Sequence, residues 1–200
     1  MNLAVALLIA YLVGAVPSSW IVAKLGAGVD LREVGSKNLG ATNLFRTLGW
    51  KYAVPAGLFD VAKGAAPVAV LSPRVGTAGW IPLVIGLGAI VGHVFSVFVK
   101  FRGGKGVATA AGVVLALAPV ALLASAVVWL VVLRLTGFVS LASMTGAVTF
   151  PIAAWLIQPN DRWVGWFGVA VAAFILFNHR SNIARLRAGT ESRFGRHGAS

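Results

Sequence analysis

The chain lacks cysteine and has few acidic residues. The absence of cysteine among its 200 residues excludes disulfide bonds, thiol nucleophiles and thiolate metal sites. The five carboxylates are few and scattered along the sequence, so neither a two-metal carboxylate cage nor a paired-carboxylate hydrolase is expected. We therefore expect neither a metal site nor a cofactor. These carboxylates are Asp30, Glu33, Asp60, Asp161 and Glu191.

Charge of either sign is also scarce. Charged residues make up 11% of the chain, against roughly a quarter in soluble domains, and 58% of it is hydrophobic. No cleavage site follows the first apolar run, so we expect a membrane anchor there rather than a removable signal peptide. The composition predicts an all-α integral membrane protein, one domain over residues 1–200, with a flexible basic tail at 193–200. The apolar runs lie at about 3–23, 53–72, 80–99, 107–133, 138–157 and 163–177.

The net charge of +12 follows the positive-inside rule of membrane proteins and does not indicate a nucleic-acid partner. Basic residues gather in segment 24–51 and after residue 179, so both regions should be cytoplasmic. Because segment 24–51 follows the first span, both regions lie on the cytoplasmic side only if the number of spans is odd. As one helix, run 107–133 would be about 40 Å long, against a hydrocarbon core of about 30 Å. Splitting it near Pro119 predicts seven transmembrane helices, some short, with the N-terminus outside and the C-terminus cytoplasmic.

Three polar segments interrupt the apolar chain, at 35–46, 100–109 and 178–193. In the second, the turn Gly103–Gly106 directly precedes an apolar helix. Glycines allow inward-pointing amides, a helix start adds further amides, and Lys105 adds a full charge, which together form an anion nest. The alternative is a flexible basic loop that only obeys the positive-inside rule.

The first polar segment offers hydrogen-bonding side chains near a cation. It contains Ser36, Asn38, Thr42 and Asn43, and Arg46 can fork two donors onto phosphate oxygens. Ser36 or Thr42 could instead cap a helix. Ser36 as an acyl nucleophile would need a base such as His179, and no acid that would orient this base is evident.

The third polar segment carries His179, Asn182 and Thr190, and His179 follows an apolar span directly. A histidine beside bound phosphate could donate to the anion or accept a proton. For His93, a satisfied interhelical hydrogen bond is the favoured interpretation. Asp60 and Lys63 stand three apart within one span, so we predict a structural ion pair. Much of the glycine should serve helix packing.

Three long motifs resemble one known family. They are GSKNLGATN at 35–43, GHVFSVFVKFRGGKGVAT at 92–109 and HRSNIARLRAGTE at 179–191, flanked by RTLGWK at 46–51 and DVAKG at 60–64. In order and position they resemble PlsY, the bacterial acyl-phosphate:glycerol-3-phosphate acyltransferase family. The resemblance implies transfer of a fatty acyl group from acyl phosphate to the 1-hydroxyl of glycerol 3-phosphate, giving lysophosphatidic acid and inorganic phosphate for phospholipid biosynthesis. It also implies a multi-pass protein of the bacterial cytoplasmic (inner) membrane, active at the cytoplasmic face and expected to be a monomer.

The resemblance also distributes roles among the polar residues. It implies that glycerol 3-phosphate is surrounded by Ser36, Arg46, Lys105, His179 and Asn182. For the phosphates, including that of the acyl donor, it implies ligands at Asn38, Thr42, Asn43, Gly103, Gly104, Gly106 and Thr190. The base is either His179 or a substrate phosphate oxygen.

Two departures from the family pattern stand out. Lys37 occupies a position where glycine is usual, and Ser96 occupies one where proline is usual. The main rival function is a transporter of a phosphorylated metabolite, which should carry polar groups near the bilayer midplane and show inverted repeats. Only Asp60 and Lys63 lie deep in a span, and no convincing repeat is evident.

Overall fold

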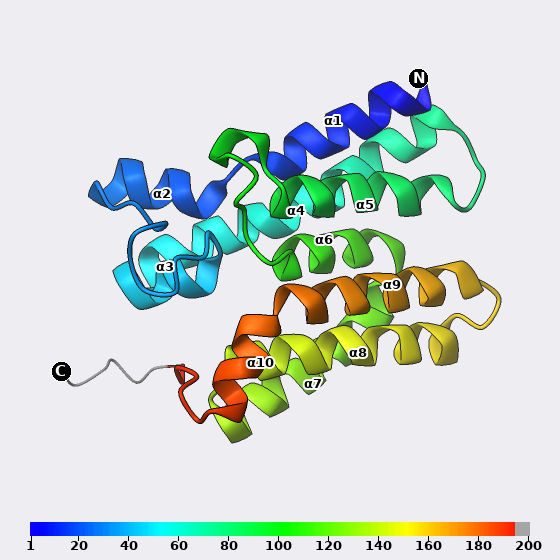
Figure 1. Cartoon of the computed structure of the whole chain (residues 1–200). Coiled ribbons are helices and arrows are strands. Elements are labelled where there is room, and N and C mark those ends of the chain that lie inside the picture. The colour runs from blue at the N-terminus through cyan, green and yellow to red at the C-terminus, as the bar shows by residue number, and fades with distance from the viewer. Residues whose placement is uncertain (195–200) are drawn as a thin grey trace. The chain divides into compact units, whose positions relative to one another are not determined.

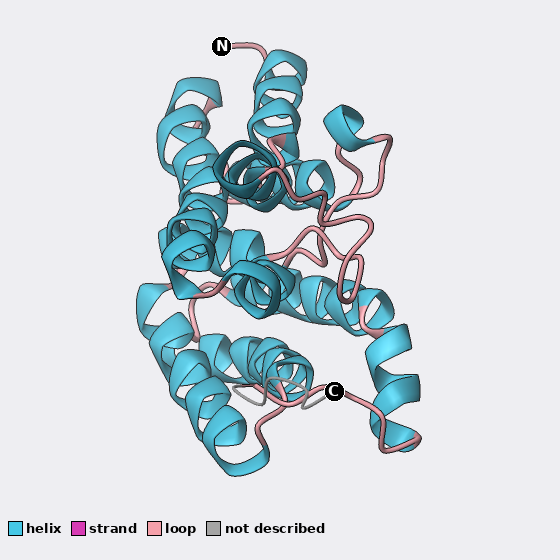
Figure 2. Ribbon diagram, turned by 90° about the vertical axis from the view of Figure 1, so that its left-hand side faces the viewer, coloured by secondary structure: helices cyan, strands magenta, loops and turns pink. Residues whose placement is uncertain are grey.

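Every regular element is a helix in the part of the chain that the computed structural model describes, residues 1–194 (Figure 1; Figure 2). This confirms the all-α prediction. The elements are α1 (Leu3–Ala15), α2 (Ser18–Ala27), α3 (Ala41–Leu48), α4 (Trp50–Val75), α5 (Ile81–Val94), the 3-10 helix η1 (Val97–Val99), α6 (Val107–Leu117), α7 (Pro119–Thr136), α8 (Val139–Ile157), α9 (Arg162–Asn178) and α10 (Arg180–Arg187).

Five helical segments of the described chain are long and apolar enough to cross a membrane, which supports the multi-pass prediction. They are Leu3–Ala27, Trp50–Val75, Ile81–Val99, Pro119–Thr136 and Val139–Ile157. The shorter apolar helices α6 and α9 would complete the seven spans that the sequence predicts. The count of seven and the orientation of the termini stay predictions.

Proline interrupts two of the apolar runs. The predicted split near Pro119 is confirmed, because α6 ends at Leu117 and Pro119 opens α7. Proline suits a first helical turn, where its missing amide has no partner to lose. The run 3–23 is likewise broken, at Val16 and Pro17, where the sequence predicts a single uninterrupted span. At both places a proline, which has no amide hydrogen, stands where one helix has ended and the next begins.

The chain forms two compact units, residues 1–117 and 118–200. Unit 1 contains α1 to α6, and unit 2 contains α7 to α10. In unit 2 the amide of Phe194 donates to the carbonyl of Gly137 (2.7 Å), and Arg193 lies 5.2 Å from the ring centroid of Phe138. The rest of the predicted flexible tail, residues 195–200, lies outside the described residues.

Glycine brings the helices of unit 1 into backbone contact. On the α1–α5 pair, a Cβ at Gly14 would overlap the carbonyl of Ala89, and Gly92 of α5 faces the backbone of α1 in the same way. Gly64 and Gly112 repeat this reciprocal arrangement on the α4–α6 pair. These four positions confirm that glycine serves helix packing here.

Candidate functional site

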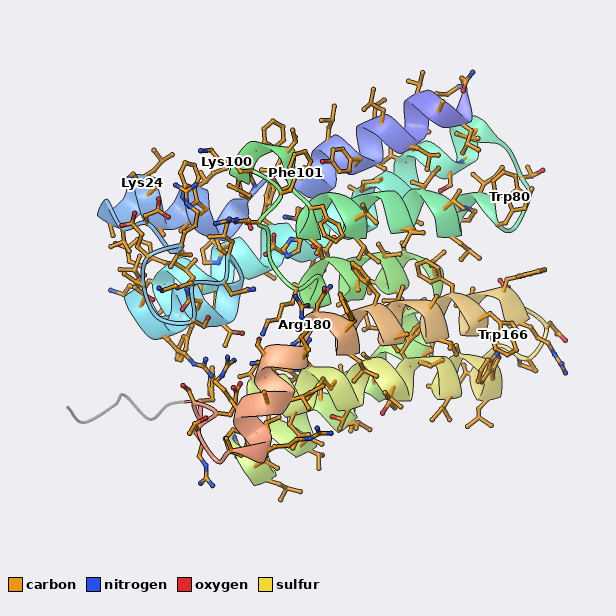
Figure 3. All side chains as sticks on the ribbon, viewed as in Figure 1. Lys24, Trp80, Lys100, Phe101, Trp166 and Arg180 are labelled. Atoms are coloured by element: carbon orange, nitrogen blue, oxygen red, sulfur yellow. The ribbon has the colours of Figure 1, made fainter. Side chains whose placement is uncertain are left out.

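Two of the three polar segments are neighbours in unit 1. Leu39 and Leu44, which belong to the first segment, share one buried hydrophobic cluster with Val99, which directly precedes the second segment. Lys24 and Lys100 lie at this end of the unit, whereas Trp80 lies at the opposite end (Figure 3). Lys100 of the second segment and Lys24, which precedes the first segment, therefore bring positive charge to this end of unit 1.

Asn43 holds the first polar segment in shape. Its side chain is 2% exposed, and its Oδ1 accepts a hydrogen bond from the amide of Ser36 at 3.0 Å. Its Nδ2 contacts the carbonyls of Leu31, Val34 and Asn38 at 3.3, 3.2 and 3.1 Å. Both ends of the amide are thus engaged by the loop that leads into α3, which indicates a loop-holding role in addition to the phosphate contact that the sequence predicts.

The side chains of this loop are not used to cap α3. Gly40 is the N-cap, and no side chain caps the helix. The alternative that Ser36 or Thr42 serves as a cap is therefore wrong. The side chain of Ser36 is exposed, and Arg46 is half-buried in the last turn of α3.

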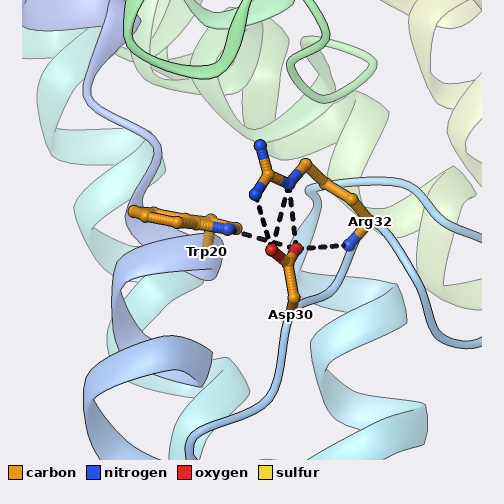
Figure 4. Close-up of polar contacts among 3 residues, drawn as sticks. All are labelled: Trp20, Asp30 and Arg32. Atoms are coloured by element: carbon orange, nitrogen blue, oxygen red, sulfur yellow. Dashed lines mark hydrogen bonds and ion pairs between the residues drawn. The ribbon is translucent and has the colours of Figure 1, made fainter.

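A second contact braces the start of the same loop (Figure 4). The carboxylate of Asp30 accepts hydrogen bonds from the guanidinium of Arg32 (2.6 to 3.2 Å), from the amide of Arg32 (3.0 Å) and from the indole of Trp20 (3.2 Å). The bonds from Arg32 hold the pKa of Asp30 well below its usual range. This cluster fixes the chain between α2 and the first polar segment.

The glycine-rich turn is folded back onto α5. The amide of Gly103 donates to the carbonyl of Val94 (2.9 Å), and the amide of Gly104 donates to that of His93 (3.2 Å). The expectation that these two amides point into an open anion nest is therefore wrong in this structure. Gly106 is buried at φ 87°, a conformation that favours glycine, and it directly precedes α6.

The cationic part of the expected nest is in place. Lys105 is half-buried and stands two residues before α6. The first amides of a helix have no intrahelical partner, and the positive end of its dipole favours an anion. Lys105 and the start of α6 thus form the anion-attracting side of the turn, while Gly103 and Gly104 anchor it.

The predicted ion pair between Asp60 and Lys63 is confirmed in α4, with Nζ 2.7 Å from Oδ1 and side chains at most 2% exposed. The same Oδ1 accepts a hydrogen bond from Ser18 (2.6 Å), and Nζ of Lys63 donates to the carbonyl of Val16 (2.7 Å). The pair therefore closes the break between α1 and α2. Nζ of Lys63 is thus a second donor to the carbonyl of Val16, which also accepts the amide of Ser18 (3.0 Å).

His93 and Ser96 contact this region differently from what the sequence predicts. Nδ1 of His93 lies 3.6 Å from Oδ1 of Asp60, beyond hydrogen-bond distance, and it has no hydrogen-bond partner among the described residues. The predicted interhelical hydrogen bond of His93 is therefore wrong. Ser96, the departure from proline, donates from its hydroxyl to the carbonyl of Ala15 at 2.5 Å.

In unit 2, His179 lies at the junction of α9 and α10. It is 3% exposed, and its Nδ1 is 2.8 Å from the carbonyl of Ile175. A carbonyl can only accept, so Nδ1 carries the proton, and the neutral ring keeps its acceptor lone pair on Nε2. This geometry suits a group that accepts a proton.

Glu191 organises the third polar segment. Its Oε1 accepts from Asn182 (2.6 Å) and Ser140 (2.7 Å), and its Oε2 accepts from Arg185 (2.7 Å). Burial raises the pKa of Glu191, but these three donors outweigh it, so the pKa lies below its usual value. Thr190 is exposed beside it, and its amide donates to the carbonyl of Arg185 (2.9 Å).

Sequence reasoning gave Glu191 no role. The available signal was its place inside the third motif as one of only five carboxylates in the chain. Nothing in the sequence pointed to Ser140, which is separated from Glu191 by 51 positions.

The chain is similar to known proteins over nearly its whole length. Residues 4–189 match the family model described as glycerol-3-phosphate acyltransferase. A glycerol-3-phosphate acyltransferase of Chlorobaculum parvum is 39% identical, and the match covers 94% of this chain and 95% of the relative.

Solved structures agree with this similarity. The crystal structure of PlsY, an integral membrane glycerol 3-phosphate acyltransferase, in its glycerol 3-phosphate form has a TM-score of 0.90 and 39% identity, covering 96% of both chains. Its lysophosphatidic acid form has a TM-score of 0.87 and 36% identity, covering 96% of this chain and 95% of the other.

Proposed function

Because the chain belongs to the glycerol-3-phosphate acyltransferase family, we propose that it acylates the 1-hydroxyl of glycerol 3-phosphate with a fatty acyl group from acyl phosphate. The hydroxyl oxygen attacks the acyl carbonyl, the bond between the carbonyl carbon and the phosphate oxygen breaks, and inorganic phosphate leaves. The product is lysophosphatidic acid, a precursor of phospholipids. The observation that carries the proposal is a cation-rich, glycine-anchored loop on an apolar helical protein of this family.

Two anions must be held close together in this reaction. Their repulsion is of order 4 kcal/mol per pair of unit charges at 4 Å in a near-surface dielectric. Arg46 and Lys105 offset that repulsion, and the start of α6 adds its dipole. Acyl phosphate already carries a good leaving group, so positioning of the hydroxyl against the carbonyl supplies much of the rate.

The remaining site residues divide between the substrates. Ser36, His179 and Asn182 join the two cations around glycerol 3-phosphate. Asn182 is held in place by Glu191, which orients its amide. The phosphates, including that of the acyl donor, are assigned to Asn38, Thr42, Asn43, Gly106 and Thr190, whereas Gly103 and Gly104 shape the turn.

The hydroxyl proton passes either to Nε2 of His179 or to a substrate phosphate oxygen. The variant His179→Gln distinguishes them, because glutamine keeps hydrogen bonding but cannot accept a proton at neutral pH. If His179 is the base, the acid limb of the pH–rate profile disappears in this variant. If a phosphate oxygen is the base, that limb stays.

We further propose that the protein works as a monomer in the bacterial inner membrane, with this site at the cytoplasmic face. The basic residues around the first and third polar segments support this side. The acyl chain of the donor stays in the bilayer while its phosphate reaches the surface.

The decisive measurement is release of inorganic phosphate from palmitoyl phosphate by the purified protein, with and without glycerol 3-phosphate. We expect acceptor-dependent release accompanied by a lysolipid. Arg46→Ala and Lys105→Ala should each lower turnover at least about a hundredfold without unfolding the protein. Lys51→Ala removes an exposed cation of the same unit and should leave turnover unchanged. A transporter would bind the substrates but give no lysolipid, and near-normal turnover of either active-site variant would contradict the assignment.

A further inference from the structure

His93 lies between a buried ion pair and the glycine-rich turn of unit 1. It is 7% exposed near the C-terminal end of α5. One side of its imidazole faces Asp60, with Nδ1 3.6 Å from Oδ1. The other side faces Gly104, where a Cβ would overlap Nε2. The ring therefore contacts the turn without belonging to it.

The carboxylate beside His93 is held in place. Oδ1 of Asp60 accepts from Ser18 at 2.6 Å and pairs with Lys63 at 2.7 Å, and both carboxylate and ammonium are nearly inaccessible to solvent. A buried charge with fixed partners has little freedom to move. Attraction between this carboxylate and the Nδ1 side of the imidazole therefore orients the ring, so that its Nε2 side is presented to the turn.

The turn rests on residue 93 through two kinds of contact. The carbonyl of His93 accepts the amide of Gly104 (3.2 Å), and the imidazole fills the space that any side chain at position 104 would need. The neighbouring amide of Gly103 is bonded to Val94 (2.9 Å). Lys105 follows Gly104 directly. The position of the imidazole therefore determines where the backbone at Lys105 leaves the turn towards α6.

We propose that His93 is a positioning residue for the reaction: its imidazole, oriented by Asp60, supports Gly104 and thereby sets the position of Lys105. This inference rests on the proposed function, in which Lys105 lies beside glycerol 3-phosphate. His93 itself touches no substrate, and it acts through the turn that it supports.

A double-mutant cycle tests this contact. Gly104→Ala places a methyl group against the imidazole and should raise KM for glycerol 3-phosphate at least about tenfold, with a smaller change in kcat. His93→Ala removes the ring that supports the turn and should raise the same KM about threefold. In the variant carrying both changes the methyl has room, so KM should fall at least about threefold below that of Gly104→Ala alone. Independent, multiplying effects of the two changes would overturn the proposal.

Thermal stability and a matched control variant distinguish the positioning role from a purely structural effect. Ser72→Ala removes another buried polar group of unit 1, on α4, and should leave KM and the thermal midpoint unchanged. His93→Ala and the double variant should keep their midpoints within a few degrees of the unsubstituted protein. If adding His93→Ala restored the thermal midpoint of the Gly104→Ala protein but not its KM, the positioning role would also be overturned.

A binding measurement separates this proposal from the proposed function. Inorganic phosphate is used as the probe, and its stabilisation of the purified protein is followed by thermal shift. Gly104→Ala should weaken phosphate binding, and adding His93→Ala should restore it, whether or not the unsubstituted protein forms a lysolipid. Absence of lysolipid would contradict the proposed function alone, whereas absence of this rescue would contradict the role of His93.

Discussion

Lys37 has a backbone conformation that is costly for its residue type. Its φ is 58°, Gly35 two positions earlier has a φ of 57°, and the amide of Lys37 donates to the carbonyl of Val34 at 3.0 Å. A left-handed conformation costs a residue with a Cβ roughly 1–2 kcal/mol. This conformation favours glycine, the residue that the resemblance to the family leads us to expect at this position.

We expect the stability of variants at position 37 to follow their tolerance of positive φ. Lys37→Gly should change the free energy of unfolding by less than about 1 kcal/mol, since relief of strain is offset by entropy of the unfolded chain. Lys37→Val should destabilise by about 1 kcal/mol or more, because β-branched residues disfavour this region. Lys37→Asn loses the same charge but tolerates the conformation, so it is the control in thermal unfolding. Equal stability of the Val and Asn variants would contradict this account.

Some residue roles depend on contacts that no sequence pattern reveals. Asp60 and Lys63 could be paired from their spacing on one helix, and the structure confirms them. Asn43 looks like any polar residue of its segment, and its role appears only when its amide is seen bonded to three carbonyls of a folded loop. The amides of Gly103 and Gly104 donate to carbonyls of α5, and no pattern in the sequence indicates these acceptors.

Between elements, the buried ion pair joins α4 to the break between α1 and α2. Removing one charge leaves the other buried and uncompensated, which typically costs about 3–5 kcal/mol. Asp60→Asn and Lys63→Met should therefore each lower the thermal midpoint strongly. The variant with both substitutions should be more stable than the two single effects together imply, as measured by unfolding in detergent. Additive losses would show that the charges do not compensate each other.

The Glu191 network makes α8 and α10 of unit 2 sensitive to acid. Because its folded pKa lies below the unfolded value near 4.5, its contribution to stability is present above that value and is lost as the pH falls through the folded pKa. Between about pH 5 and pH 3, the thermal midpoint of Glu191→Gln should fall less than that of the unsubstituted protein. Glu33→Gln, which changes an exposed carboxylate, should retain the full fall in midpoint. An unchanged slope for Glu191→Gln would contradict the role of its carboxylate.

Element boundaries were predictable where proline or length forces them. Pro119 divides a run too long for one span, so both composition and length point to a break there. Pro17 interrupts a run of ordinary span length, so length gave no reason to divide it. The short helices α3 and α10 lie in segments that read only as polar, because their stability comes from packing and from buried contacts such as those of Asn43 and Asn182.

For the whole molecule, the absence of cysteine allows the predicted topology to be measured directly. Single cysteines at three exposed positions report on the start of α4 (Lys51), the connection between α8 and α9 (Asn160) and the end of α10 (Arg187). With seven spans and an external N-terminus, a membrane-impermeant maleimide should label Asn160→Cys in intact spheroplasts. Lys51→Cys and Arg187→Cys should react only after lysis. External labelling of Arg187→Cys would require an even number of spans and contradict the topology.

The reciprocal glycine pairs of unit 1 restrict how lipid reaches the protein. At Gly14 and Gly92, and again at Gly64 and Gly112, the backbone of one helix lies directly against that of the next. A methylene chain is wider than the space left between two backbones in van der Waals contact. Both seams are consequently closed to hydrocarbon along these stretches. An acyl phosphate whose tail stays in the bilayer must therefore approach the glycine-rich turn by a path that passes between neither α1 and α5 nor α4 and α6.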